Sequence, residues 1–252
     1  MERVFDSHLH IINSKYPLVT NNGYLPSDFF VSDYLKRVAA LNIQSGVVVS
    51  ASFQAFDQTY LMNALSLLNK SGSEYVGVTQ ISSVVSDQEL LALHDHGVRA
   101  VRFNLRRGGS AAVSELEFMA HRIHDLVGWH VELYTGFESL ISLKDTLTRL
   151  PSVCIDHLAL EKKSHHLLAH LVGGGVKVKA TGFGRLDFDP YPCISHLYGI
   201  NPDAIMFGTD LPSTRADTPF MDRHFYQLLD TLGASAAQKV CWDNGRSFYG
   251  LS

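Results

Sequence analysis

The sequence has little of what marks several classes of protein. Its three cysteines, Cys154, Cys193 and Cys241, are far apart and form no C-x-x-C pair, which argues against a zinc knuckle and a disulfide framework. No run of about 18 apolar residues occurs, so we expect no transmembrane helix and no membrane partner. The first residues lack the basic and then apolar pattern of a signal peptide. We therefore expect a cytoplasmic protein.

The chain also lacks an excess of positive charge. It has 21 Lys and Arg residues against 25 Asp and Glu residues, a formal net charge of −4. Nucleic-acid binding usually needs a basic surface, so we expect no nucleic-acid partner. Of its 252 residues, 46% are hydrophobic and 18% are charged, which is typical of a globular protein. This composition is compatible with a homo-oligomer and does not set the number of subunits.

Short β-branched runs alternate with longer helical patterns along the chain. The predicted strands are Arg3–Asp6, Gly46–Ala51, Tyr75–Thr79, Val98–Phe103, His130–Tyr134, Val153–Asp156, Val176–Ala180 and Ile205–Gly208. The predicted helices cover residues 28–42, 57–69, 86–96, 111–127, 138–149, 161–172, 190–199, 222–232 and 234–248. Ser27, Asp57 and Ser86 stand where helix N-caps are expected.

This alternation predicts parallel β-α-β units. Eight units in a chain of 252 residues fit a (β/α)8 barrel better than a doubly wound sheet. An open nucleotide-binding sheet usually has a glycine-rich loop after an early strand, where this chain has His8-Leu9-His10. We therefore predict an α/β protein with the TIM-barrel fold, as a single domain over residues 1–252.

The active sites of such barrels lie where the strands end. Because side chains alternate along a strand, we expect Asp6, His8 and His10 on one face of the first strand, with Phe5 and Leu9 directed to the helices. Two imidazoles on one face are suited to binding a metal ion or to donating hydrogen bonds to an oxyanion.

Two further strands end in residues of the same kind. His157 follows the sixth strand, and Asp210 follows the eighth strand, on the face opposite Phe207. A carboxylate there, across the barrel from the first strand, is placed to act as a general base toward water. Lys179 is expected inside the barrel, where a buried ammonium group needs a partner such as Glu132 or Asp6.

Arginines stand at two other strand ends. Arg102 lies on the fourth strand, Arg106 and Arg107 follow in the next loop, and Arg185 follows the seventh strand. Guanidinium groups grip carboxylates through paired hydrogen bonds. The cluster predicts a local anion site, and the choice between Arg106 and Arg107 stays open.

Several segments together resemble the amidohydrolase superfamily. They are Asp6-Ser7-His8-Leu9-His10, Val101-Arg102-Phe103-Asn104, Ile155-Asp156-His157, Phe207-Gly208-Thr209-Asp210-Leu211-Pro212 and the closing run from Trp242 to Tyr249. They are most similar to the branch that contains 2-pyrone-4,6-dicarboxylate lactonase and sugar lactonases. The resemblance covers nearly the whole chain in order.

This resemblance implies a distorted (β/α)8 barrel that opens a lactone by hydrolysis. It implies that His8, His10 and His157 polarise the lactone carbonyl and that Asp210 activates water. The substrate contacts that it implies are Arg102, one of Arg106 and Arg107, Arg185, Tyr134 and Ser52.

Three functions compete on this basis. The first is a hydrolase that opens a small carboxylated lactone without a metal ion, because the arginines make the pocket electropositive and unfavourable for a divalent cation. The second is a mononuclear zinc hydrolase or decarboxylase of the same superfamily, with the ion on His8, His10, His157 and Asp210. The third is a barrel that only binds an organic acid. The retained histidines and Asp210 argue against this third function.

Overall fold

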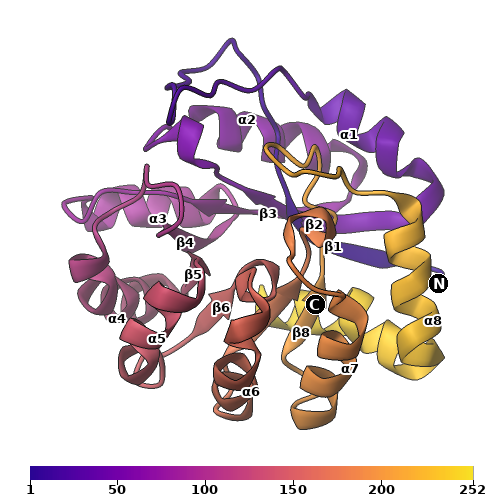
Figure 1. The fold of residues 1–252 in the computed structure, drawn as a ribbon. Coiled ribbons are helices and arrows are strands. Elements are labelled where there is room, and N and C mark those ends of the chain that lie inside the picture. Colours follow the sequence, from indigo (N-terminus) through magenta and orange to yellow (C-terminus); the bar gives the residue numbers. More distant parts are fainter. Residues whose placement is uncertain (252) are drawn as a thin grey trace.

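The computed structural model describes residues 1–251. Eight parallel strands form one sheet in which each strand pairs with the next in chain order. The sheet curls into a nearly closed barrel, and the helices follow one another around its outside (Figure 1). The predicted TIM-barrel fold is therefore confirmed. The strands are β1 Val4–Leu9, β2 Ile43–Val49, β3 Glu74–Thr79, β4 Val98–Asn104, β5 His130–Tyr134, β6 Val153–Ile155, β7 Lys177–Ala180 and β8 Ile205–Phe207.

The α-helices fall close to the ranges that the sequence predicts. They are α1 Val31–Val38, α2 Thr59–Leu68, α3 Asp87–Asp95, α4 Leu116–Val127, α5 Phe137–Leu147, α6 His165–Gly173, α7 Pro190–Ile200, α8 Asp222–Gln238 and α9 Asn244–Phe248. Ser86 is the N-cap of α3, as predicted, and accepts from the backbone N–H of Glu89 at 3.2 Å. The prediction for Ser27 is wrong, because α1 begins only at Val31.

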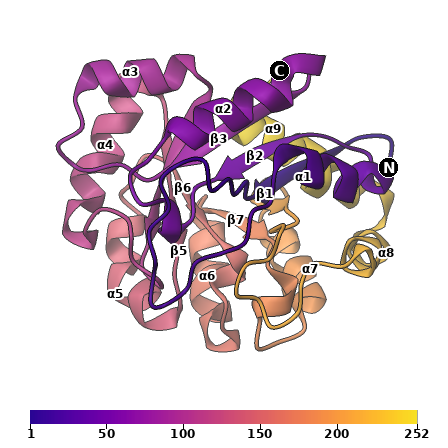
Figure 2. The same cartoon turned by 90° about the horizontal axis from the view of Figure 1, so that it is seen from above.

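The C-terminal helical region differs from the prediction in its internal breaks. Gly233 takes φ of 71° inside α8, a left-handed conformation that costs glycine little. A π-helical turn, Lys239–Asp243, then leads into α9. Helix α9, yellow in Figure 2, packs against β1 and β8. Its Gly245 lies directly on the Phe5 ring. A side chain at Gly245 would clash with that ring, so the close approach requires glycine.

The barrel closes between β8 and β1 at the end where the site residues lie. The N–H of Asp210 donates to the carbonyl of His8, and the N–H of His10 donates to the carbonyl of Leu211, both at 2.7 Å. These bonds join the chain just beyond β8 to the end of β1. They therefore set the positions of His8, His10 and Asp210 relative to one another.

The inner and outer faces of the strands carry different side chains. The apolar interior of the barrel is one cluster: Phe5, Val47, Val49, Val76, Val78, Ala100, Cys154, Met206, Trp242 and Tyr249. A larger apolar layer lies between the strands and the helices. Polar inward side chains are left for the carboxyl ends of the strands. Among residues 1–251, no helix is long and apolar enough to cross a membrane.

Candidate active site

A small cavity of about 40 Å³ lies at the carboxyl ends of the strands. It is lined by His10, Ala51, Ser52, Phe53, Arg102, Asn104, Arg107, Tyr134, His157, Arg185, Asp210, Thr214 and Arg215. The structure thus brings together all but two of the catalytic and substrate-binding residues that the sequence predicts. The exceptions are His8, which lies behind the cavity against the rings of His10 and His157, and Arg106.

His10 and Asp210 face each other across this cavity. Nδ1 of His10 lies 2.7 Å from the carbonyl oxygen of Val49. A carbonyl oxygen only accepts, so Nδ1 carries a proton. Nε2 of His10 lies 3.6 Å from Oδ1 of Asp210, and this oxygen is buried without a hydrogen-bond partner. A neutral His10 therefore presents a second acceptor beside the carboxylate.

His8 is fully buried and lies beside Asp156. Its Nδ1 is 3.3 Å from Oδ1 of Asp156, and neither of its ring nitrogens has a hydrogen-bond partner of good geometry. Burial, followed by the nearby charge of Lys179, holds the pKa of His8 well below its usual value. The imidazole is therefore neutral near pH 7.

His157 is held by an unusual turn of backbone. His157, Leu158, Ala159 and Leu160 all have φ between 50° and 65°, a left-handed region that costs roughly 1–2 kcal/mol per residue. Burial lowers the pKa of His157 to about 4. A Cβ on Gly182 would lie 2.5 Å from Nδ1 of His157, so glycine is required for the close approach of this imidazole.

The first strand departs from the predicted alternation. Asp6 does not share the inward face with His8 and His10, because the pairing of β1 with β2 shifts register between Asp6 and Leu9. The Asp6 carboxylate accepts from the Tyr34 hydroxyl of α1 at 3.0 Å and from the Thr209 N–H at 2.8 Å. Phe5 packs inside the barrel instead of toward the helices. Asp6 is thus a buried structural group, and burial raises its pKa to about 6.

Two of the predicted arginines are already ion-paired. Nε and NH2 of Arg102 lie 2.9 Å from Oδ2 of Asp156, and its NH1 donates to the Ser50 carbonyl. Arg185 donates from Nε to Oδ2 of Asp210 at 2.6 Å. Burial opposes ionisation of Asp210, but the charge of Arg185 outweighs it and holds the carboxyl pKa well below its usual range.

The structure separates the two arginines between which the sequence could not choose. Arg107 lines the site cavity. Arg106 is half exposed and lies 3.5 Å from Glu161, lining a second, outer cavity of about 380 Å³. Tyr134 lines both cavities, and Ser52 lines the inner one.

Lys179 is inside the barrel, as predicted, and its partner is Glu132 rather than Asp6. The Nζ–Oε2 distance is 2.6 Å, and Nζ is 3.9 Å from Asp156. Burial alone would raise the pKa of Glu132, yet the charge of Lys179 lowers it to about 2. The pair lies beneath the site. Asp156 contacts Lys179 and also contacts His8 and Arg102, so it connects the pair to these two residues.

Two residues of the site were missed by the sequence reasoning. Asp156 contacts His8, Arg102 and Lys179, although the sequence predicts no role for it. Its inward position follows from alternation with Cys154, so the signal was present. Arg215 lines both cavities but lies in an irregular segment after β8, where no periodicity predicts the direction of a side chain.

The donor atoms at the site also fit a single divalent cation. His8, His10 and Asp210 offer ligand atoms that all lie within 4.8 Å of one another, as do His8, Asp156 and His157. Among residues 1–251, the buried atoms without a hydrogen-bond partner include both ring nitrogens of His8 and Oδ1 of Asp210. Two imidazoles and one carboxylate, with an open position, are a donor set used by catalytic zinc.

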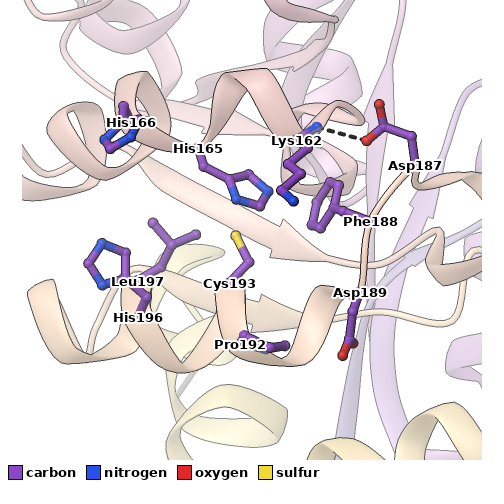
Figure 3. Close-up of a pocket in the computed structure, with 10 residues that line it drawn as sticks. All are labelled: Lys162, His165, His166, Asp187, Phe188, Asp189, Pro192, Cys193, His196 and Leu197. Atoms are coloured by element: carbon purple, nitrogen blue, oxygen red, sulfur yellow. Dashed lines mark hydrogen bonds between the residues drawn. The ribbon is translucent and has the colours of Figure 1, made fainter.

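A larger cavity lies away from the site, between α6 and α7, and measures about 520 Å³ (Figure 3). The thiol of Cys193 points toward His165 there. Burial raises the pKa of this thiol to about 11, so it is protonated near pH 7 and poorly suited to act as a nucleophile. The cavity also lacks the strand-end residues, and we assign it no part in catalysis.

By its fold and site, the protein is a parallel (β/α)8 barrel with histidines at the ends of β1 and β6 and an aspartate after β8. The family model described as amidohydrolase matches residues 5–251. The chain therefore belongs to the amidohydrolase family, as the sequence motifs indicate.

Two curated relatives resemble parts of this chain. A 2-pyrone-4,6-dicarboxylate hydrolase of Comamonas testosteroni is 34% identical over 61% of this chain and 50% of its own length. A 4-sulfomuconolactone hydrolase of Rhizobium radiobacter is 26% identical over 82% of this chain and 75% of its own length. The match thus spans about half the length of the first relative and three quarters of the second.

Solved structures show the same fold over the full chain. A probable 2-pyrone-4,6-dicarboxylic acid hydrolase of Acinetobacter baumannii, with citric acid bound, superposes with a TM-score of 0.84 at 19% identity, covering 100% of both chains. A similarly described protein of Pseudomonas putida gives 0.80 at 24% identity, covering 99% of this chain and 98% of its own. At these identities the superpositions establish the fold alone.

Proposed function

We propose that this protein hydrolyses a small lactone that carries a carboxylate. The observation that carries the proposal is the pair of acceptors, Oδ1 of Asp210 and Nε2 of His10, which face each other at 3.6 Å in a cavity lined by arginines. A water molecule between them can donate one hydrogen bond to each. The named activities of the two curated relatives, on a pyrone dicarboxylate and on a sulfonated muconolactone, support the same substrate class.

The basicity of Asp210 depends on Arg185. The Arg185 guanidinium lowers the carboxyl pKa of Asp210, which makes Asp210 a weak base. A substrate carboxylate bound to Arg185 adds negative charge beside Asp210 and raises its pKa. We infer that substrate binding itself prepares Asp210 to take a proton from water.

His8 and His157 supply the opposite requirement, which is stabilisation of negative charge on the carbonyl oxygen. Both are buried and neutral near pH 7. His157 lines the cavity, and His8, which lies behind it, has two ring nitrogens without a hydrogen-bond partner. A neutral imidazole can donate one N–H to an oxyanion. His10, whose Nδ1 donates to the Val49 carbonyl, leaves Nε2 as an acceptor beside Asp210.

The reaction then balances in two steps. Water loses a proton to Asp210 while its oxygen bonds to the carbonyl carbon, and the ring C–O bond breaks with return of the proton to the leaving oxygen. The product is a hydroxy acid or its keto tautomer, and ionisation of the new carboxyl group releases one proton to solvent. In this proposal no metal ion takes part, and the arginines hold the substrate.

A second candidate is a zinc-dependent hydrolase or decarboxylase, which the clustered donor atoms of His8, His10 and Asp210 favour. A bound divalent cation would act there as a Lewis acid and lower the pKa of water. This chain's residues would hold it, with Asp156 orienting His8 from behind.

The experiment is a screen of carboxylated lactones scored by proton release, before and after exhaustive chelation, with elemental analysis of the purified protein. We expect turnover that survives chelation. Near-stoichiometric zinc, with activity lost on removal and restored on return, would establish the second candidate. Tight binding of the acids without turnover, in both forms of the protein, would indicate an organic-acid-binding barrel.

A further inference from the structure

The arginines at the mouth of the barrel differ in whether they have an acidic partner. Arg102 pairs with Asp156, Arg185 with Asp210 and Arg106 with Glu161. Within residues 1–251, no ion pair with a carboxylate is found for the two other arginines that line the inner cavity, which are Arg107 and Arg215.

Arg215 is nevertheless held in one orientation. Its guanidinium stacks on the Tyr24 ring at 4.3 Å. Its NH1 donates to Oδ1 of Asn21 at 3.0 Å, and its NH2 donates to the Asn21 carbonyl. The Nδ2 of Asn21 donates in turn to the Arg107 carbonyl. The segment between β1 and α1, indigo in Figures 1 and 2, thereby joins the segments that follow β4 and β8.

The backbone at Arg215 also takes a conformation that an arginine seldom adopts. Its φ is 60°, in the left-handed region, where a residue other than glycine is strained. Glycine and asparagine adopt this conformation more readily than arginine does. The fold thus keeps a cationic side chain at a position where the backbone favours another residue.

The two cavities place Arg215 at a boundary. Arg107, Tyr134, Arg185 and Arg215 line both the inner cavity of about 40 Å³ and the outer cavity of about 380 Å³. A single water needs roughly 10–15 Å³ of such volume, so the inner cavity holds only a few waters. A lactone whose carbonyl lies beside Asp210 must therefore extend toward the outer cavity, past the four residues that line both cavities.

The charge balance favours an anion at this boundary rather than farther out. Glu161, Asp187 and Asp217 also line the outer cavity. Glu161 is paired there with Arg106, and the two aspartates repel an anion. At the boundary, burial and then the positive charge of Arg107 lower the pKa of Arg215. An anionic group placed between the two guanidiniums would relieve this repulsion.

We propose that Arg215 determines specificity by binding a second anionic group of the lactone, a carboxylate or a sulfonate, on the side of the ring away from the reacting carbonyl. Asn21 and Tyr24 hold the guanidinium in place for that contact. The inference rests on the proposed lactone hydrolysis and adds to it the residue, Arg215, that holds the anionic group farther from Arg185.

The test compares Arg215→Gln with Arg223→Gln, which removes one positive charge from the exposed first turn of α8. Steady-state kinetics are measured with a lactone that carries two anionic groups and with its analogue that carries one. We expect Arg215→Gln to raise KM for the doubly charged lactone at least about tenfold. We expect its KM for the singly charged lactone, and both values in Arg223→Gln, to stay within about twofold of the wild type.

Arg215→Lys is the second variant, and it keeps the charge while losing the paired donors and the planar face. We expect it to recover part of the selectivity. Thermal unfolding of each variant separates misfolding from lost recognition. An equal rise of KM for both lactones, or no rise, would overturn the assignment while leaving the proposed hydrolysis intact.

Calorimetry with the unreactive acids tricarballylate and butyrate gives a readout that does not need turnover. We expect Arg215→Gln to weaken tricarballylate at least about tenfold relative to butyrate. If the wild type opens no lactone, the proposed function fails, and this binding ratio still decides the role of Arg215. A ratio unchanged between wild type and Arg215→Gln would reject it.

Discussion

Arg185 and Asp210 form an ion pair inside the site, with Nε of the guanidinium 2.6 Å from Oδ2 of the carboxylate. The residue predicted to hold the substrate therefore controls the residue predicted to activate water. Burial raises the carboxyl pKa, and Arg185 more than offsets that effect. The two roles are coupled, because a substrate acid that engages Arg185 also restores the basicity of Asp210.

Arg185→Met tests this coupling. We expect the variant to bind a carboxylated ligand about 10 to 100 times more weakly, the scale of a lost charge-assisted hydrogen bond. Because Arg185 lowers the pKa of Asp210, its removal should also move the acidic limb of the kcat/KM profile to higher pH. Calorimetry and a pH series measure the two effects. Weaker binding with an unchanged acidic limb would show that Arg185 binds the substrate without controlling the pKa of Asp210.

Arg102→Met should act first on stability. It leaves the Asp156 carboxylate buried beside the neutral His8 ring at 3.3 Å, with Lys179, at 3.9 Å, as the remaining cation, and breaking a buried pair costs about 3–5 kcal/mol. Denaturant unfolding measures this loss. As a control, Arg149→Met breaks the exposed pair with Glu117 and should cost at most about 1 kcal/mol.

The double variant Arg102→Met with Asp156→Asn should regain part of the stability, because it removes the unpaired charge. If Arg102→Met instead costs no more than the Arg149 control while raising KM, Arg102 is a substrate contact and has little part in holding the fold.

Gly208→Ala should disturb catalysis through His8. A Cβ at Gly208 would lie 2.8 Å from the His8 backbone nitrogen, so β1 must shift, and a displacement near 1 Å can cost about a hundredfold in rate. We expect kcat to fall at least about tenfold. Gly199→Ala is the matched control, because a Cβ there meets nothing within 4 Å. Equal activity of the two variants would show that this contact does not position His8.

The stability of the fold should depend on pH through His157. Its folded pKa of about 4 lies below the unfolded value of about 6.5. The unfolded chain therefore takes up the proton first, and stability present above pH 6.5 is lost as the pH falls toward 4. The expected loss from this group is about 3 kcal/mol.

Urea unfolding at pH 7.5 and pH 4 measures this loss, and His157→Gln should show a fall between the two pH values that is smaller by about that amount. An identical fall in wild type and variant would show that His157 titrates normally in the folded protein.

The alternation of strands and helices made the barrel predictable, and the polar residues at the strand ends made much of the site predictable. Alternation along β5 and β7 placed Glu132 and Lys179 inside, and the structure pairs them at 2.6 Å. The same rule failed at Phe5 and Asp6, because it assumes regular pairing and β1 shifts register against β2. Arg215 and the left-handed turn at His157 follow from long-range contacts of irregular segments, which no local pattern encodes.

The most direct measurement of the central claim is turnover of a carboxylated lactone by chelated wild-type protein beside Asp210→Asn, followed by proton release. We expect the wild type to release one proton for each ring opened. We expect the folded Asp210→Asn variant to be at least about a hundredfold slower, the scale of a lost general base. Equal rates in the two proteins, or no turnover by the wild type with any lactone of the class, would contradict the account.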